Sequence, residues 1–131
     1  MTNEELIKIA IEAKNNSYSP YSHYKVGAAL LTKDGRVFKG TNVENCGYTP
    51  ANCAERSAFF SAISNGAKRG GFAKIAIVGD SEGIAYPCGV CRQVIVELAP
   101  DIEIICAKDE TYYEVKSIQD LLPNAFTPDD L

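Results

Sequence analysis

Apolar and polar positions at the start of the chain follow a helical period. In residues 3–14, "NEELIKIAIEAK", apolar side chains recur at helical spacing, and Thr2 stands three positions before Glu5, which is the capping-box pattern. We therefore predict a helix from about residue 3 to residue 14. The turn-forming segment 15–23, "NNSYSPYSH", ends that pattern, so the only histidine, His23, is expected in a loop.

Two strand-like segments follow, 24–32 ("YKVGAALLT") and 36–43 ("RVFKGTNV"). Between them, "KDG" contains an Asp-Gly pair, which favours a hairpin because glycine tolerates the positive φ of a tight turn. The two segments are therefore predicted to pair as antiparallel strands. A polar loop then leads to 53–64, an alanine-rich segment predicted to be a helix, with Pro50 tolerated near its start.

The second half of the chain alternates strands with helices. Segment 73–79 has the pattern of a buried strand, 88–99 that of a helix ended by Pro100, and 102–107 that of another buried strand. A strand, a helix and a strand in this order form a right-handed parallel unit. Segment 111–117 follows after only about four polar residues, too few for a parallel crossover, so it is expected to run antiparallel.

The tail, residues 118–131, is expected to begin as a short helix and to finish irregularly. Together the elements predict an α/β fold with three layers, α/β/α, around a mixed five-stranded sheet. The chain length of 131 residues suits one sheet and a few helices. Residues 1–131 are therefore predicted to form a single domain.

Charge and hydropathy narrow the classes of partner. The formal net charge is −4 and the 13 Lys and Arg residues are scattered, whereas a protein that binds a nucleic acid polymer usually carries a basic stripe. The same scatter disfavours binding to a membrane surface, and the apolar runs are too short to cross a bilayer. Met1 leads into a polar, acidic segment, so no signal peptide is expected and the predicted location is cytoplasmic.

The cysteines are the clearest candidates for chemistry. There are five, an odd number in a chain for which no secretion signal is expected, which favours metal binding or catalysis over a disulfide framework. They are Cys46, Cys53, Cys88, Cys91 and Cys106.

Three of these cysteines fall where a predicted helix begins. Cys88 and Cys91 are three positions apart and share one helix face, and Cys53 starts another helix. Because helix N-termini lower thiol pKa, these positions favour the thiolates that bind metals. If both helix starts meet at one sheet edge, three thiolates could bind one Zn²⁺ and leave its fourth position to water, as in catalytic zinc sites.

Charged residues beside these cysteines extend the hypothesis. Glu55 is a candidate general acid–base that takes a proton from water and passes it to a substrate nitrogen. Three thiolates leave Zn²⁺ less positive than neutral imidazoles do, so Arg56 and Arg92 are candidates for offsetting thiolate charge by hydrogen bonding.

Simpler interpretations remain open from the residues alone. Glu55 lies three positions after Asn52 and could be only a helix cap. Cys46 could be a fourth ligand and close a structural zinc site. The C-x-x-C pair could be a redox dithiol, although such a motif would not need Cys53. Cys106, inside an apolar strand, is expected to be a core residue.

The motifs together resemble a known family. "CAE" and "PCGVC" resemble the signature of the zinc-dependent nucleoside and base deaminases. "YSHYKVGAALL", "GTNVEN", "GYT", "CAERSA", "PCGVCRQV" and "LLPNAF" extend the likeness to the short cytidine deaminases over nearly the whole chain. The resemblance implies a single catalytic domain that converts cytidine and deoxycytidine to uridine and deoxyuridine, as in pyrimidine salvage.

The resemblance assigns roles by position. It implies that Cys53, Cys88 and Cys91 bind Zn²⁺, and that zinc-bound hydroxide attacks C4 while Glu55 shuttles the proton. Asn42 and Glu44 would hold ribose hydroxyls, and the backbone around Ala54 would face the pyrimidine ring.

The resemblance also implies a homotetramer with shared active sites. Tyr48 would reach a neighbour's ribose and Phe126 would stack over a neighbour's base; the alternative for Phe126 is packing of the tail on its own domain. Tyr24 departs from the family, which usually has Phe there, and its hydroxyl needs a partner or water.

Three other functions are weighed against nucleoside deamination. A deaminase for a cytosine-bearing antibiotic such as blasticidin S has a similar size and zinc signature, but the "NVEN" stretch argues against it. The acidic balance of charge disfavours a polynucleotide deaminase. A zinc-stapled binding module without catalysis would bind the metal through four cysteines, including Cys46.

Overall fold

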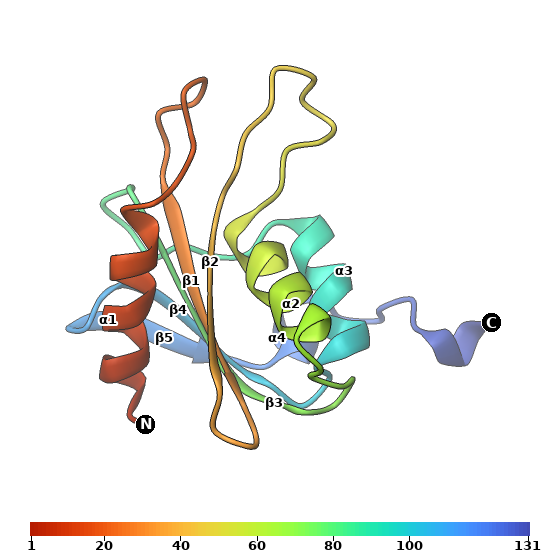
Figure 1. The fold of residues 1–131 in the computed structure, drawn as a ribbon. Helices are drawn as coiled ribbons and strands as arrows, with labels where there is room; N and C mark the ends of the chain where they lie inside the picture. The colour runs from red at the N-terminus through yellow and green to blue at the C-terminus, as the bar shows by residue number, and fades with distance from the viewer.

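A five-stranded sheet forms the centre of the computed structural model, which describes all residues 1–131. Its strands lie side by side in the order β2-β1-β3-β4-β5 (Figure 1). Only β3 and β4 are parallel, so the sheet is mixed, as predicted. The strands are β1 (Val26–Thr32), β2 (Val37–Thr41), β3 (Phe72–Gly79), β4 (Glu103–Asp109) and β5 (Tyr112–Lys116).

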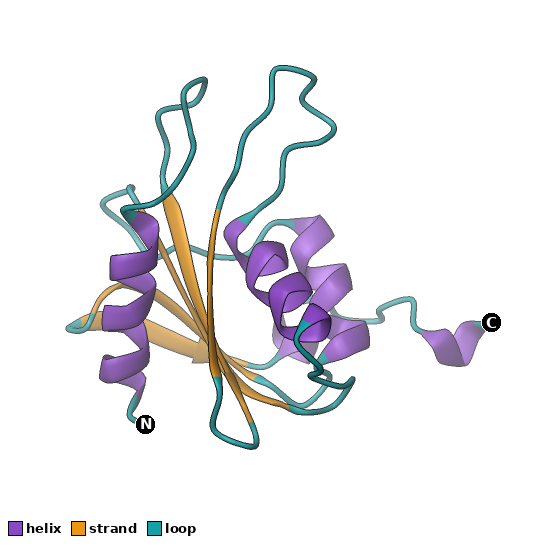
Figure 2. Cartoon of the chain, viewed as in Figure 1, coloured by secondary structure: helices purple, strands orange, loops and turns teal.

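Helices cover both faces of the sheet, which confirms the predicted three layers. Helix α1 lies on one face, and α2, α3 and the short α4 lie on the other (Figure 2). None of them has the length and hydrophobicity that crossing a membrane requires. The helices are α1 (Asn3–Lys14), α2 (Ala54–Ser64), α3 (Gly89–Leu98) and α4 (Ile118–Leu121).

The apolar strands are buried on both faces because each contributes alternate side chains to two cores. In β3, Ile75 and Ile77 pack toward α2 and α3, whereas Ala76 and Val78 pack toward α1. Cys106 is fully buried on the α2–α3 side of β4, which confirms it as a core residue. Burial is also the main cause that raises the pKa of its thiol to about 12.

Glycines in the hairpin let helices approach the sheet closely. A Cβ at Gly40 would lie 2.2 Å from the carbonyl oxygen of Ala54, and one at Gly27 would lie 2.1 Å from that of Ala10. No side chain fits at either position. Gly40 therefore allows the first turn of α2, which carries Cys53 and Glu55, to sit directly on β2.

Local signals predicted the elements correctly, and the limits of α1 as well, but not the ends of the strands. Thr2 and Glu5 form the predicted capping box of α1. Most strands differ from their predicted limits by one or two residues, because pairing with neighbours rather than local pattern sets where they end. The tail is less irregular than predicted: Thr127 caps a short 3₁₀ helix, η1 (Pro128–Asp130).

Candidate metal centre and active site

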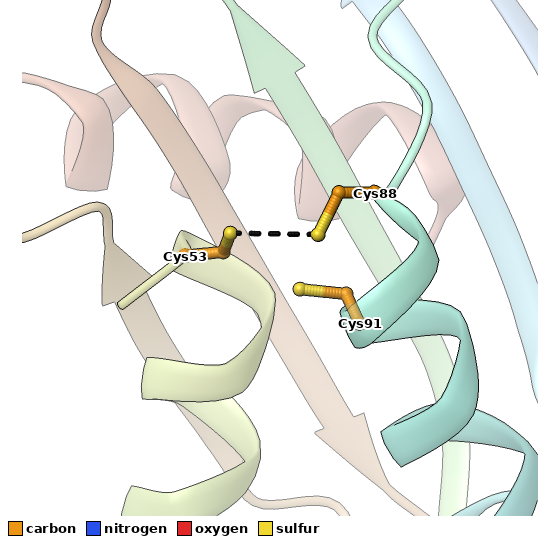
Figure 3. Close-up of side chains that lie close together, drawn as sticks. All are labelled: Cys53, Cys88 and Cys91. Carbon is orange, nitrogen blue, oxygen red and sulfur yellow. Dashed lines mark hydrogen bonds between the residues drawn. The ribbon is translucent and has the colours of Figure 1, made fainter. Parts of the chain in front are cut away.

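Three cysteines from two helix starts meet at one end of the sheet. Cys53 is the N-cap of α2, Cys88 is the N-cap of α3, and Cys91 lies in the first turn of α3. Neither N-cap cysteine makes a side-chain capping bond, so both sulfurs are free for another ligand. Their side chains point toward one another (Figure 3). The predicted convergence of the three sulfurs is thus confirmed.

The spacing of the sulfurs fits a tetrahedral metal ion. All three lie within 4.8 Å of one another, and Cys53 Sγ and Cys88 Sγ are 3.6 Å apart. Sulfurs bound to one tetrahedral Zn²⁺ at about 2.3 Å would be separated by roughly 3.8 Å. The donor set and its geometry therefore suit zinc.

Hydrogen bonds stabilise a thiolate in this cluster. Bonds to Cys53 from the Cys91 thiol, from Arg56 and from Cys88 lower the pKa of Cys53 to about 5. The bond to Cys53 and burial raise the pKa of Cys91. Arg56 donates to Cys53 Sγ at 3.3 Å, and its Nε is buried without an acceptor. One guanidinium thus places positive charge against the sulfurs, as the sequence suggested for Arg56.

A closed four-cysteine site does not form within this chain. Cys46 is exposed in the loop before α2 and is absent from the cluster of candidate ligands. The cluster offers three protein ligands, and a tetrahedral metal would keep one position for water or substrate.

Glu55 is buried beside the cluster. It occupies the first turn of α2 and is only 4% exposed. Burial, together with the negative charge of Cys53, raises the pKa of Glu55 to about 7, in the range that suits a general acid–base near neutral pH. The capping interpretation is wrong, because the N-cap position of α2 is Cys53 and not Asn52. Asn52 instead donates to Ser57 Oγ at 3.3 Å.

A cavity of about 270 Å³ opens next to the metal centre. It brings together six predicted site residues from four segments of the chain, and five further residues complete its lining. The predicted ones are Tyr24, Asn42, Cys53, Ala54, Glu55 and Cys88; the others are Val26, Ile77, Ile84, Ala85 and Tyr86.

Asn42 is held in a fixed orientation at the cavity. Its Oδ1 accepts from the Val26 amide at 2.9 Å and from Ser17 Oγ, and its Nδ2 donates to the Tyr24 carbonyl at 2.7 Å. These partners assign the amide orientation and leave one Nδ2–H for a further acceptor.

Glu44 lies outside that cavity, in a neighbouring hollow that Tyr21, Ser22 and Tyr48 also line. Its carboxylate accepts from the amides of Tyr21 and Ser22 at 3.0 and 3.1 Å, and from Ser22 Oγ. The bond from the Ser22 hydroxyl is the main cause that lowers the pKa of Glu44. Glu44 therefore ties the loop after α1 to the strand end that carries Asn42.

Two predicted aromatic residues do not reach the cavity in this chain. Tyr48 is 79% exposed in the loop before α2 and has φ of +60°. Phe126 is 58% exposed in the tail, which projects away from the sheet (Figure 1). The phenyl ring of Phe126 is thus not buried in its own chain, contrary to the packing alternative.

Arg92 has different partners from those expected. Its Nε donates to the Pro87 carbonyl at 2.8 Å and its Nη1 to the Leu121 carbonyl at 2.6 Å, and it makes no hydrogen bond to sulfur. The guanidinium therefore joins the start of α3 to the end of α4.

Comparisons with known proteins agree with this geometry. Residues 1–107 match the sequence profile of the cytidine and deoxycytidylate deaminase zinc-binding region. The chain belongs to this family. The matched residues include all three clustered cysteines and Glu55, so the cluster is a possible zinc site inside a zinc-binding deaminase region.

Relatives that match over nearly their whole length are named cytidine deaminases. The cytidine deaminase of Halalkalibacterium halodurans is 45% identical over 132 residues, covering 100% of this chain and 98% of that protein. The crystal structure of cytidine deaminase from Burkholderia pseudomallei superposes with a TM-score of 0.93 at 50% identity, covering 96% of this chain and 100% of the other. That from Mycobacterium tuberculosis gives 0.80 at 36% identity, covering 93% and 94%. The predicted resemblance and fold are confirmed.

Sequence reasoning missed part of the lining of this cavity. Ile84, Ala85 and Tyr86 precede the P-C-x-x-C motif, yet only the proline and cysteines carried a recognisable signal. Val26 and Ile77 read simply as core strand residues. For Ile84, Ala85 and Tyr86, the one available clue was their position just before the helix that carries Cys88 and Cys91.

Proposed function

We propose that the protein catalyses hydrolytic deamination of cytidine and deoxycytidine to uridine and deoxyuridine, with ammonia released, as a step of pyrimidine salvage. One observation carries the proposal: two of the three convergent cysteines, Cys53 and Cys88, and the buried carboxylate of Glu55 line the same cavity as Asn42. The uncharged ligand and the net charge of −4 are compatible, since a nucleoside has no phosphate to be repelled.

The roles follow from what each residue can reach. Cys53, Cys88 and Cys91 hold Zn²⁺, which supplies the Lewis acidity that lowers the pKa of water. Glu55 accepts one proton from the attacking water and delivers it to N3 of the base, then accepts the second proton from the new hydroxyl at C4 and delivers it to the departing amino group. Arg56 offsets the charge of the thiolates.

Substrate contacts come from the cavity wall and the loops. The remaining Nδ2–H of Asn42 and a lone pair of Glu44 bind ribose hydroxyls, the backbone at Ala54 faces the pyrimidine, and the ring of Tyr24 forms a wall. Tyr48 and Phe126 act on a neighbouring copy in a homotetramer, Tyr48 at the ribose and Phe126 over the base. Their exposure and the positive φ of Tyr48 support this use, because strained backbone is retained where it serves a site.

Turnover of cytidine by Glu55→Gln tests the proposal most directly. Wild-type, zinc-loaded protein should convert cytidine and deoxycytidine to products detected by ultraviolet absorbance, and a chelator should stop the reaction. Glu55→Gln should retain zinc and far-ultraviolet circular dichroism but lose roughly 10²–10⁴-fold or more in kcat. A wild-type protein that binds zinc but leaves both nucleosides unchanged would contradict the proposal and favour a binding module.

A further inference from the structure

Two segments far apart in the chain both contribute to the cavity wall. Tyr24 belongs to the loop after α1, whereas Ile84, Ala85 and Tyr86 belong to the loop between β3 and α3. A cavity lined by loops keeps its shape only if those loops are held relative to one another. The contacts of Tyr24 supply such a link.

Tyr24 is fixed through its backbone and its hydroxyl. Its amide donates to Ser22 Oγ at 3.0 Å, and its carbonyl accepts from Asn42 at 2.7 Å. Its hydroxyl donates to Ser81 Oγ at 3.2 Å, and Ser81 in turn donates to the Gly83 carbonyl at 3.3 Å. The bond path from Tyr24 therefore ends on the residue immediately before Ile84.

Gly79 makes room for this hydroxyl. A Cβ at position 79 would lie 2.4 Å from Tyr24 Oη, and 3.1 and 3.3 Å from its ring carbons Cζ and Cε1. A tyrosine in this position therefore requires a residue without a side chain at the end of β3. Without the hydroxyl, only the two tight ring contacts would remain.

We infer that Tyr24, Gly79 and Ser81 form a clasp that joins the two loop walls of the cavity and positions them for the nucleoside. The inference rests on the proposed function. Ser81 does not line the cavity, so the clasp holds the ring of Tyr24 by its outer edge and leaves the ring itself as a wall. Tyr24 and Ser81 are in this respect positioning residues, because their hydroxyls do not touch the reacting atoms. Losing their bond lowers the fraction of molecules in which both walls are held in place, which weakens apparent binding of the nucleoside.

Three variants test the bond between the two side chains: Tyr24→Phe, Ser81→Ala and the double variant. Because the bond is exposed, each single change should raise KM for cytidine roughly 2- to 5-fold, with kcat within about twofold of wild type. The double variant should resemble either single one, since both remove the same bond. Tyr112→Phe and Ser64→Ala are matched controls, because both side chains are exposed and make no side-chain hydrogen bond.

Gly79→Ala tests the space for the hydroxyl. The new methyl group would displace Tyr24, so KM should rise by more than in Ser81→Ala. Adding Tyr24→Phe should partly restore KM, because it removes the closest contact. A restored KM would not be expected if Gly79→Ala acted only by stiffening the strand. Gly79→Ala and Tyr24→Phe effects that simply multiply would overturn the steric part of the inference.

Hydrogen exchange in ligand-free protein separates failure of the clasp from failure of the proposed function. The amide of Ala85 donates to the Ala107 carbonyl at 3.3 Å, so its protection reports whether the second wall is held. Exchange at Ala85 should accelerate in Ser81→Ala and Tyr24→Phe but not in the controls. Wild-type exchange and wild-type KM in both variants would overturn the clasp, whereas accelerated exchange in a protein that does not deaminate cytidine would support the clasp and contradict the proposed function.

Discussion

The metal end of the proposed site takes its side chains from the first turns of α2 and α3, whereas the loop end, formed by Asn42 in the cavity and Glu44 in the neighbouring hollow, takes them from loops. Cys53, Glu55 and Cys88 are placed by helices that pack directly on the sheet. Asn42 and Glu44 instead follow β2, in a segment held to the loop after α1 by hydrogen bonds. One end is fixed by the core and the other by a polar network.

This difference predicts two kinds of functional defect. Changes at the helix starts should act on the metal or on the chemical step and leave the rest of the molecule intact. Changes in the loops should act mainly on substrate binding, because exposed hydrogen bonds open more readily than a packed core. Variants at the two ends should therefore separate into effects on kcat and effects on KM.

The largest effect is expected for Cys91→Ser. Cys91 is fully buried in the cluster, and serine is a poor ligand for zinc, so zinc per chain should fall to near zero and deamination with it. Metal analysis of the purified protein checks the loss of zinc, and turnover of cytidine checks the loss of deamination. Cys46→Ser is the matched control and should keep zinc and activity. Loss of zinc from Cys46→Ser, with Cys91→Ser unaffected, would show that the cluster is not the metal site.

A smaller effect, confined to binding, is expected for Glu44→Ala. The change removes three hydrogen bonds to a carboxylate and releases the loop at Tyr21 and Ser22, so KM for cytidine should rise roughly 10- to 100-fold while kcat changes much less. Glu103→Ala, an exposed change on β4 that breaks no side-chain bond, serves as the control. A fall in kcat with unchanged KM would break the distinction between the two ends.

The metal end could be predicted from the sequence because its signals are short-range spacings along the chain. The spacing of Cys88 and Cys91 and the placement of Cys53 at a helix start are visible in the letters alone, and the alternating cores follow from continuous apolar strands. The helix-cap alternative for Glu55 failed because the N-cap of α2 is Cys53, one residue later than Asn52.

The loop end could not be predicted in the same way, because its contacts join residues far apart in sequence. The partner of the Tyr24 hydroxyl, Ser81, is 57 positions away, and the partner of the Arg92 guanidinium, the Leu121 carbonyl, is 29 positions away. Arginine beside a cysteine suggested charge compensation, but a flexible side chain bonds to whichever acceptor the fold brings near. Only Arg56, whose partner lies one helical turn away, kept the local partner expected of it.

The smallest effect is expected for Gln93→Ala, which tests how the tail is joined to the metal-binding helix. Gln93 Nε2 donates to the Phe126 carbonyl at 2.8 Å, so it fixes the residue proposed to stack over a neighbour's base. Loss of this one exposed bond should raise KM only about 2- to 3-fold. Gln119→Ala is a matched control, because Gln119 also donates to a main-chain carbonyl, that of Pro100, at 3.0 Å.

Phe126→Ala makes the same test decisive. If Gln93 acts through Phe126, then Gln93→Ala should have no further effect on KM once the phenyl ring is gone, whereas Gln119→Ala should have the same small effect in both backgrounds. If Gln93→Ala raised KM just as much in the Phe126→Ala protein as in wild type, the bond from Gln93 to the tail would not act through Phe126. In that case the tail would not take part in substrate binding through Gln93, and the comparison would be limited to the helix starts and the loops.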